Sequence, residues 1–316
     1  MNIKKIIKNF LYTLAGVFIV MMIFNLFIYF KIHPEQSIKP KPNTDNAKYY
    51  AFKLPDKVDF AGEKVPIEYF DVRESLDKEI LKIAYWHSEL FLYLKRANRV
   101  FPIVEPILKK YGIPDDFKYL MVAESGLVNI SSPAGAEGYW QLMKKTAREY
   151  GLEVNDEVDE RYHLEKSTIA ACKYLKRRYN KYKTWAMVAA SYNAGDAGIS
   201  RYTNYQKVNT YYDLAMFEET GRYVYRAIAF KLIMSHPEKY GFMIEKEDLY
   251  PIIPYQKVVV DSAITNMIAF ANKYNTNYKI FKILNPWLRA HKLSNKFKKT
   301  YILKMPKKGA RKTKEQ

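Results

Sequence analysis

The chain has 316 residues, of which 48% are hydrophobic and 16% aromatic, so it can bury a globular core and a second small module. This composition excludes a disordered or collagen-like protein, and the single cysteine, Cys172, excludes an intramolecular disulfide. The net charge of +19 leaves three classes of partner open, which are nucleic acid, an anionic membrane surface and an acidic polymer.

Residues 1–30 predict a membrane anchor. Three lysines among the first eight residues precede an apolar run from Phe10 to Phe30. That run is long enough to cross a hydrocarbon core of ~30 Å at ~1.5 Å per residue, and its basic flank predicts that the chain after Phe30 lies outside the cytoplasm. A cleaved signal peptide is the alternative, but its apolar region would be shorter and followed by a small-x-small site. Residues 31–48 are polar, include three prolines and predict an extended tether.

Residues 49–110 predict a helical region. An apolar series at helical spacing runs from Val72 through Ile83 to Leu90, which favours one amphipathic helix. Two prolines then mark the opening of another helix, Val104 to Tyr111. None of the five histidines of the chain stands at ligand spacing from a second histidine or a carboxylate cluster, so we expect no metal and no cofactor.

The stretch after Pro114 carries the main candidate for chemistry. A short helix is predicted from about Asp116 to Ser125, since it starts with acidic residues and stops at Gly126. Its apolar residues recur at i, i+3 and i+4, and position i+7 of this series is Glu124. Burial and the negative end of the helix dipole would raise the pKa of this carboxyl, so that it could donate a proton near neutral pH. The alternative is a glutamate that turns to solvent or pairs with Lys118.

A loop of small residues follows, from Gly126 to Gln141, with almost nothing that could form a core. Gly138 would let the backbone approach a bulky ligand, and the Gln141 amide offers both a donor and an acceptor. An ordinary connection between helices is the alternative. Later segments are predicted as a helix at Lys144 to Tyr150, a solvated acidic loop at Glu153 to Glu160, helices at Ser167 to Lys181 and Trp185 to Ala194, and a helical, tyrosine-rich stretch at Asn209 to Tyr240.

The composition changes after Phe242. A β-branched run at Val258 to Val260 predicts a strand, and Tyr301 to Leu303 predicts a closing strand. Two short helices are expected between them, at Ile264 to Asn272 and Tyr278 to Leu284. Residues 255–306 therefore predict a small α+β module, followed by a basic tail at 307–316.

Four short motifs follow one another along the chain. They are Glu124-Ser125, Ser132 to Gln141 (SPAGAEGYWQ), Ser191 to Gly195 (SYNAG) and Glu219 to Val224 (ETGRYV). Together they resemble the motifs of the lytic murein transglycosylases, glycoside hydrolase family twenty-three, and among these the membrane-bound D type. The usual forms are E-S, S-x-x-G-A-x-G-L-M-Q, A-Y-N-x-G and E-T-x-x-Y-V. This chain departs from them at Ser191, where Ala is usual, and at Tyr139-Trp140, where Leu-Met is usual. The second departure would reshape a subsite and leaves the preferred glycan length open.

The resemblance implies a mainly α fold with a goose-lysozyme-like helical catalytic domain at 111–245. It implies peptidoglycan strands as the partner. The predicted anchor places the rest of the chain on the extracytoplasmic, periplasmic side, which argues against nucleic acid as the partner. Residues 255–306 resemble, more loosely, a LysM module, which binds N-acetylglucosamine polymers.

The resemblance also implies a reaction. Glu124 would protonate the oxygen between N-acetylmuramic acid and N-acetylglucosamine, and would then act as the base that yields a 1,6-anhydromuramoyl end. The residues expected to line the saccharide site are Ser125, Ser132, Gly138, Gln141, Tyr192, Asn193, Glu219 and Tyr223. A hydrolase with two carboxylates is less favoured, because Glu137 and Glu149 fit no motif position. A muramidase using the same site and a non-catalytic peptidoglycan-binding scaffold remain as alternatives.

Overall fold

The computed structural model describes residues 21–22 and 51–312. The chain divides into two units, Met1–Tyr50 and Ala51–Gln316, and the second holds all the elements named below. No helix within the described residues is both long and apolar enough to span a bilayer. The predicted anchor and tether, residues 1–48, lie outside the described part of the chain except for Met21 and Met22.

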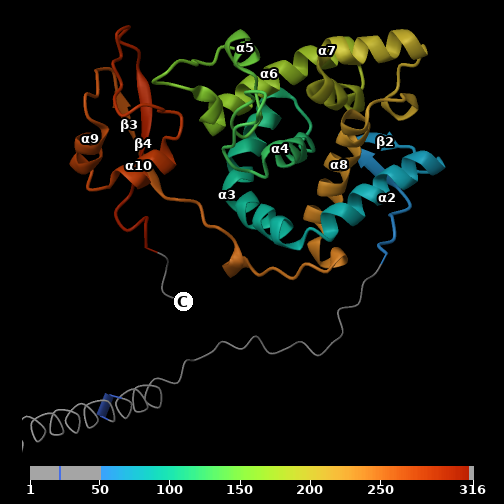
Figure 1. Ribbon diagram of the computed structural model, residues 1–316, viewed down its shortest axis with the longest axis horizontal. Helices are drawn as coiled ribbons and strands as arrows, with labels where there is room; N and C mark the ends of the chain where they lie inside the picture. Colours follow the sequence, from blue (N-terminus) through green and yellow to red (C-terminus); the bar gives the residue numbers. More distant parts are fainter. Residues whose placement is uncertain (1–20, 23–50, 313–316) are drawn as a thin grey trace, which may run out of the picture. The chain divides into compact units, whose positions relative to one another are not determined.

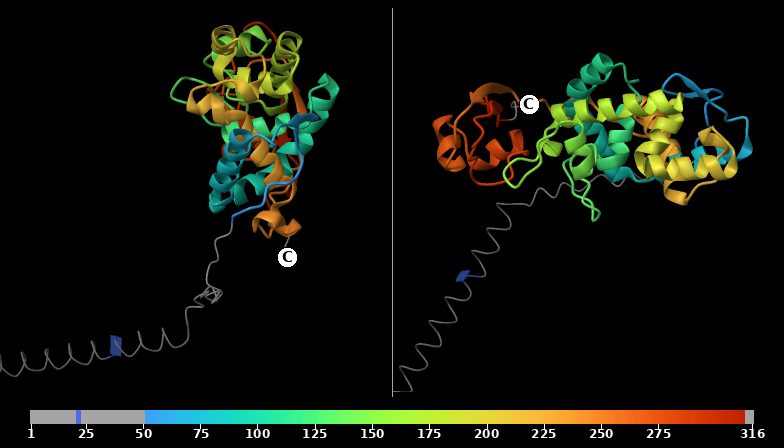
Figure 2. Two further views of the ribbon diagram at one scale, coloured as in Figure 1. Left: turned by 90° about the vertical axis from the view of Figure 1, so that its right-hand side faces the viewer. Right: turned by 90° about the horizontal axis from the view of Figure 1, so that it is seen from above.

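The second unit is mainly helical, and its two small two-stranded sheets lie apart (Figures 1 and 2). The α-helices are α2 (Phe70–Ala84), α3 (His87–Tyr111), α4 (Phe117–Ser125), α5 (Lys144–Glu149), α6 (Leu164–Tyr182), α7 (Trp185–Gln206), α8 (Glu218–Ser235), α9 (Met267–Lys273) and α10 (Tyr278–Leu284). The strands are β1 (Val58–Phe60), β2 (Glu63–Val65), β3 (Tyr255–Val260) and β4 (Tyr301–Pro306). β1 pairs antiparallel with β2, and β3 with β4, in the register Val58↔Val65 and Tyr255↔Pro306.

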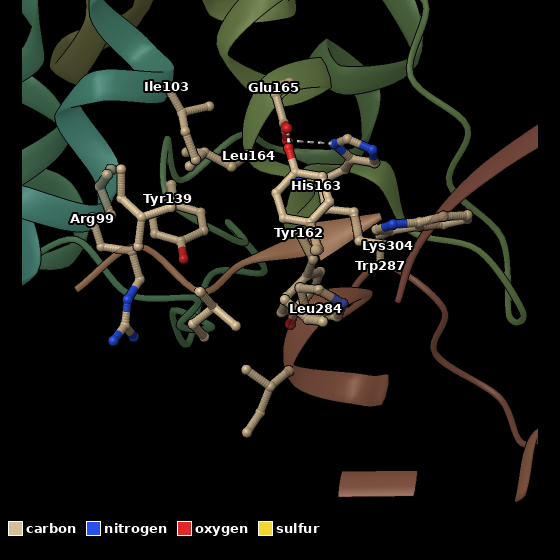
Figure 3. Close-up of a pocket in the computed structure, with 16 residues that line it drawn as sticks. Arg99, Ile103, Tyr139, Tyr162, His163, Leu164, Glu165, Leu284, Trp287 and Lys304 are labelled. Carbon is tan, nitrogen blue, oxygen red and sulfur yellow. Dashed lines mark hydrogen bonds and ion pairs between the residues drawn. The ribbon is translucent and has the colours of Figure 1, made fainter. Parts of the chain in front are cut away.

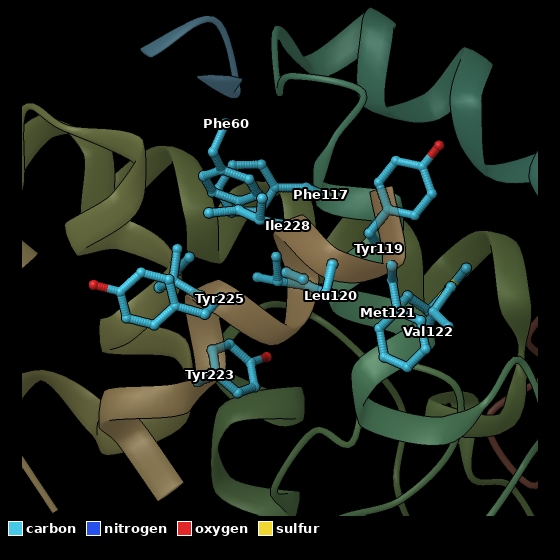
Figure 4. Packing of buried hydrophobic residues seen from close by; sticks show 14 of the residues in the cluster. Phe60, Phe117, Tyr119, Leu120, Met121, Val122, Tyr223, Tyr225 and Ile228 are labelled. Atoms are coloured by element: carbon cyan, nitrogen blue, oxygen red, sulfur yellow. The ribbon is translucent and has the colours of Figure 1, made fainter. Parts of the chain in front are cut away.

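Helix α4 is enclosed by the helices around it. Seven of its nine residues are buried, and it packs mainly against α8 and α3. Figure 4 shows Phe117 and Leu120 of α4 beside Ile228 of α8, with Phe60 of β1 closing the cluster. The predicted apolar face of this helix is confirmed, and Gly126 ends it in the left-handed conformation at φ 57°.

The predicted single helix from Val72 to Leu90 is wrong. The chain breaks at Tyr85 and Trp86, where α2 ends and α3 begins. Trp86 is 52% exposed and packs its ring edge-on against Tyr93 of α3, at 6.0 Å between centroids. Neither Gly nor Pro marks this break, so the local sequence carries no signal for it.

The predicted helix start at Val104 is also wrong. Helix α3 runs without interruption through Pro102 and Pro106, although each proline removes a backbone donor. Both prolines lie on the exposed side of the helix, where water can bind the freed carbonyls, while Val104 and Leu108 are buried on the other side. The prolines therefore lie on the solvent-exposed face of α3 and do not mark its first turn.

Gly195 interrupts α7 as predicted, with φ 71° and ψ 165°, but the chain resumes as a helix up to Gln206. The stretch predicted as helical from Asn209 to Tyr240 contains α8 flanked by two short 3-10 helices, Tyr211–Asp213 and Pro237–Tyr240.

Cys172 is fully buried within α6, and burial raises the pKa of its thiol to about 12.

The C-terminal module has the predicted order of strand, two helices and strand. Its buried cluster includes Phe281, Trp287 and Leu303. The module also covers part of the stretch that we expected to be a solvated loop. Asp159 and Glu160 are 7% and 4% exposed, so the prediction for Glu153 to Glu160 is wrong in its second half.

Candidate active site

Glu124 lies in the last turn of α4, partly buried, and accepts a hydrogen bond from the Tyr223 hydroxyl at 2.5 Å. Burial raises the pKa of Glu124 to about 7, against an ordinary value of 4.5. The hydrogen bond from Tyr223 and the charge of Arg226 lower this pKa, and the charge of Glu219 raises it. The carboxyl is therefore substantially protonated at neutral pH, as an acid catalyst requires.

The alternative of a surface ion pair is excluded for Glu124. Lys118 instead pairs with Glu105 at 2.7 Å and with Asp115 at 2.5 Å. Ser125, next to Glu124, is buried and donates its hydroxyl to the Met121 carbonyl one turn back in α4, at 3.1 Å. The Ser125 hydroxyl is thus hydrogen-bonded within its own helix in this structure.

This raised pKa predicts the pH dependence of catalysis. An acid catalyst must enter the reaction protonated, so with Glu124 in that role kcat/KM should be highest below pH 7 and should fall as pH rises through about 7. A pH–rate profile of cell-wall solubilisation checks this. A profile that stays flat from pH 6 to about pH 9 would contradict the role of Glu124 as the acid.

Tyr223→Phe provides a second test of the same carboxyl. The Tyr223 hydroxyl favours the ionised form of Glu124 by donating to it. Its removal should raise the pKa of Glu124, so the alkaline limb of the pH–rate profile should move to higher pH. Tyr225→Phe is a matched control, because Tyr225 is a second buried tyrosine of α8 that points to another side of the helix, and we expect it to leave the limb unmoved. A limb that shifts downward in Tyr223→Phe would contradict the assignment.

The loop from Ser131 to Leu142 is held by its own turns. The Ser132 hydroxyl accepts from the Ala136 amide at 3.0 Å, and Gln141, at φ 45°, donates its side-chain amide to the Gly138 carbonyl at 2.8 Å. Gly138 has φ 79°, and a Cβ there would lie 2.1 Å from the Arg161 carbonyl oxygen. Only glycine fits at this point, because the backbone of Arg161 occupies the space of a side chain.

The expectation that this loop contributes almost nothing to a core is wrong for Trp140. Its ring is fully buried, and its indole donates to the Thr168 hydroxyl at 2.9 Å. The Trp140 carbonyl accepts from Tyr192 at 2.6 Å. Trp140 thus fastens the loop to α6 and α7.

Tyr192 and Asn193 lie just before the break at Gly195 in α7. The charge of Glu124 raises the pKa of Tyr192, after the larger effect of burial, so the two groups are close enough to interact. Asn193 accepts from the Thr220 hydroxyl at 2.9 Å, which links the third motif to the fourth. The structure therefore brings Glu124, Tyr192 and Tyr223 into one electrostatic neighbourhood. Glu219 is exposed and pairs with Arg226 at 3.0 Å, and its charge acts on Glu124 from there.

Two family models match the chain. Residues 103–214 match the transglycosylase SLT domain, and residues 256–309 match the soluble lytic transglycosylase C-terminal LysM-like domain. The chain carries a lytic transglycosylase SLT domain. It is 26% identical over 183 residues to the membrane-bound lytic murein transglycosylase D of Escherichia coli K12, and equally to that of Escherichia coli O6:H1. The match covers 56% of this chain and 40% of each relative, so the chain spans less than half the length of these proteins.

The SLT domain depends on side chains outside its own match. Glu219 and Tyr223 lie beyond residue 214, on α8, and α2 and β1 lie before residue 103. Tyr223, α2 and β1 contribute to the core that runs from Val58 to Phe242, whereas Glu219 is exposed.

Glu79 was missed by the sequence reasoning. It lies on α2, is 1% exposed, and pairs with Arg222 at 2.5 Å and with Arg226 at 3.6 Å. Since Arg226 lowers the pKa of Glu124, Glu79 anchors a cation that acts on the candidate acid. The sequence did carry a signal for a buried carboxylate here, because Glu79 stands three residues after Leu76 in the apolar series of α2. Glu124 occupies the same kind of position in the apolar series of α4.

A cavity of about 150 Å³ lies between the SLT domain and the C-terminal module (Figure 3). Tyr139 and Arg99 line it from the SLT domain side, and Trp287 and Lys304 from the module. Glu124 does not line this cavity. Glu124 remains the candidate acid, because the raised pKa and the motif residues Tyr192 and Tyr223 occur there.

Proposed function

We propose that the chain is a lytic transglycosylase that cleaves the bond between N-acetylmuramic acid and N-acetylglucosamine in peptidoglycan. One observation carries the proposal. Glu124, in the first motif, is a carboxyl whose pKa is raised to about 7 and which receives a hydrogen bond from Tyr223 of the fourth motif. The SLT domain match and the name of the relatives support the same reaction class.

A mechanism with one acid fits the carboxylates around the site. A two-carboxylate glycosidase needs a second free group across the bond. Glu219 is held by Arg226, Glu149 by Arg177, and the Glu137 carboxylate accepts from Ser131 and Tyr162. Each is already engaged, so we propose that the substrate supplies the second group through its own acetamido oxygen.

The proposed reaction has two steps. Glu124 gives its proton to the bridging oxygen, the N-acetylglucosamine leaves as an alcohol, and the acetamido oxygen stabilises the cationic C1. Glu124, now ionised, takes the proton of the muramic C6 hydroxyl as that oxygen bonds to C1. The 1,6-anhydro end forms, no water is consumed, and Glu124 returns to its protonated form. Gln141, Ser132 and Gly138 are proposed to line the saccharide site together with Ser125, Tyr192, Asn193, Glu219 and Tyr223.

The mass of the products tests the proposal. Purified peptidoglycan is digested with the full chain and the muropeptides are weighed. Anhydromuramoyl ends, lighter by one water than reducing ends, support the transglycosylase. Reducing ends instead would favour the muramidase alternative. Digestion that persists in Glu124→Gln would favour another active site, and no digestion by the wild type would favour the scaffold.

We further propose that residues 1–30 anchor the protein in the membrane and residues 31–48 tether it, with a goose-lysozyme-like domain at 111–245 on the extracytoplasmic side. The region 49–110 and the module at 255–306 would flank this domain, and residues 307–316 would form a basic tail. The word membrane-bound in the relatives' name supports the anchor. Fractionation of cells checks this, since an anchored chain should be extracted by detergent and not by salt.

A further inference from the structure

The C-terminal module does not close its hydrophobic core with its own residues. Val158 and Tyr162 of the SLT domain, 1% and 6% exposed, belong to the same buried cluster as Phe281, Trp287 and Leu288 of the module. A module that moved freely on a tether would expose these side chains to water. The shared core therefore indicates a docked module.

Backbone hydrogen bonds join the same two segments. The Asp159 amide donates to the Trp287 carbonyl at 2.8 Å, and the Arg289 amide donates to the Glu157 carbonyl at 2.8 Å. Val158 and Leu288 form the antiparallel bridge between them. Segment 157–159 thus pairs with the module along a short strand-like edge.

The two sides of this interface also carry opposite charges. Between Gln256 and Pro306 the module has ten Lys or Arg residues and one acidic residue, Asp261. The Glu157 carboxylate accepts from the Ser294 amide at 2.7 Å and from the Ser294 hydroxyl at 2.6 Å. Glu153 pairs with Lys299 at 3.1 Å. Figure 3 shows Glu165 and Lys304, which form another ion pair across this interface.

The residues just after this segment hold the second motif. The Arg161 guanidinium donates to the Gly135 carbonyl at 2.9 Å and to the Leu142 carbonyl at 3.2 Å. The Tyr162 hydroxyl donates to the Glu137 carboxylate and lies 3.0 Å from the Ser131 hydroxyl. The Tyr162 ring itself lies in the module's core, with the Arg289 guanidinium 4.0 Å from its centre.

The contacts continue to the candidate acid. The loop that Arg161 and Tyr162 hold at both ends carries Trp140, whose carbonyl accepts from Tyr192. Tyr192 in turn interacts electrostatically with Glu124. The hydrogen bonds in this series join buried or partly buried groups, and such groups have few alternative arrangements.

We propose that the C-terminal module is a fixed part of the catalytic unit, and that Tyr162 is the positioning residue through which its docking holds loop 131–142 beside Glu124. This inference rests on the proposed function for its effect on catalysis, but the coupling itself is a property of the fold. A module that is docked in this way also presents any glycan it binds in a constant geometry relative to the site.

Two variants of the full chain test the coupling. Tyr162→Phe keeps the ring in the shared core and removes only the hydroxyl that binds Glu137. Val158→Asp puts a charge into the shared core without altering the loop. We expect both to accelerate amide hydrogen exchange in residues 131–142 by about tenfold. Both should also lower kcat by about tenfold or more with little change in KM, because the loop would be misplaced rather than lost.

The matched controls are Tyr274→Phe, which removes a module tyrosine hydroxyl that takes part in none of these contacts, and Val259→Asp, at a position 67% exposed on β3. Both should behave as the wild type. Unchanged exchange in loop 131–142 of Tyr162→Phe would overturn the proposal. So would Val158→Asp with a raised KM, an unchanged kcat and a protected loop, which would make the module only a glycan anchor.

The exchange measurement needs no enzymatic activity, which separates the two proposals. If Glu124→Gln lyses cell wall as well as the wild type, the proposed function fails while the exchange data still decide the coupling. If Val158→Asp does not fold, Tyr162→Phe alone decides it.

Discussion

Glu124→Gln is expected to lower the rate of peptidoglycan solubilisation by about 10²–10⁴-fold, because the amide occupies the same space but cannot give up a proton. The fold should remain and become more stable at alkaline pH. In the folded state the pKa of Glu124 is about 7 against 4.5 for the free side chain, so the folded protein binds more protons between these values. Unfolding free energy is then lost as pH rises from about 4.5 to 7, on the order of 3 kcal/mol in all, and Gln removes this loss.

The measurement combines muropeptide release with urea unfolding at pH 5 and pH 8. Glu149→Gln is the matched control, since Glu149 pairs with Arg177 with both side chains exposed and should affect neither quantity. A Glu124→Gln variant with normal lytic activity would remove Glu124 from the mechanism. Equal stability gains at both pH values would instead show that Glu124 is not protonated at pH 5 to the extent its burial implies.

Gly138→Ala is expected to cost roughly 2–5 kcal/mol of stability and most of the activity. A Cβ at Gly138 would lie 2.1 Å from the Arg161 carbonyl oxygen and 2.8 Å from its carbon, and both are backbone atoms that cannot turn away. The loop or the segment at Arg161 must therefore shift. Urea unfolding and the lytic assay on the full chain measure the two effects.

Gly135→Ala separates the clash from backbone strain. Gly135 also has a positive φ, 84°, but nothing lies within 4 Å of its added Cβ. We expect it to lose only about 1 kcal/mol, from the left-handed backbone alone. Similar losses of stability in the two variants would mean that the loop shifts easily to make room for a Cβ at Gly138. That result would contradict the expected clash with the Arg161 backbone.

The parts of the fold with local signals were predictable. The acidic start, the apolar series and Gly126 gave the position of α4, and the β-branched run at Val258 to Val260 gave β3. Glu124 was found because a carboxylate interrupts an apolar face. These signals lie within a few residues of the feature they predict.

The features of the fold that could not be predicted from the sequence depend on contacts between residues far apart in the chain. Trp140 stands in a loop of small residues, and its burial depends on α6, which supplies Thr168, and on α7, which supplies Tyr192. The burial of Val158 in the predicted solvated loop could not be foreseen, because the module whose core includes it lies more than a hundred residues later in the chain. No helix-breaking residue marks the break at Trp86, which packs against Tyr93 of the next helix. Burial of this kind is decided by tertiary structure, which overrides local propensity.

The position of Cys172 has a practical consequence. The thiol is fully buried in α6 and its pKa is raised to about 12, so almost no thiolate meets solvent while the protein is folded. As the chain has one cysteine, any reaction with a thiol reagent reports the opening of the helical core around α6. The protein thus carries its own chemical probe of unfolding, which would withstand an oxidising compartment for as long as that core stays closed.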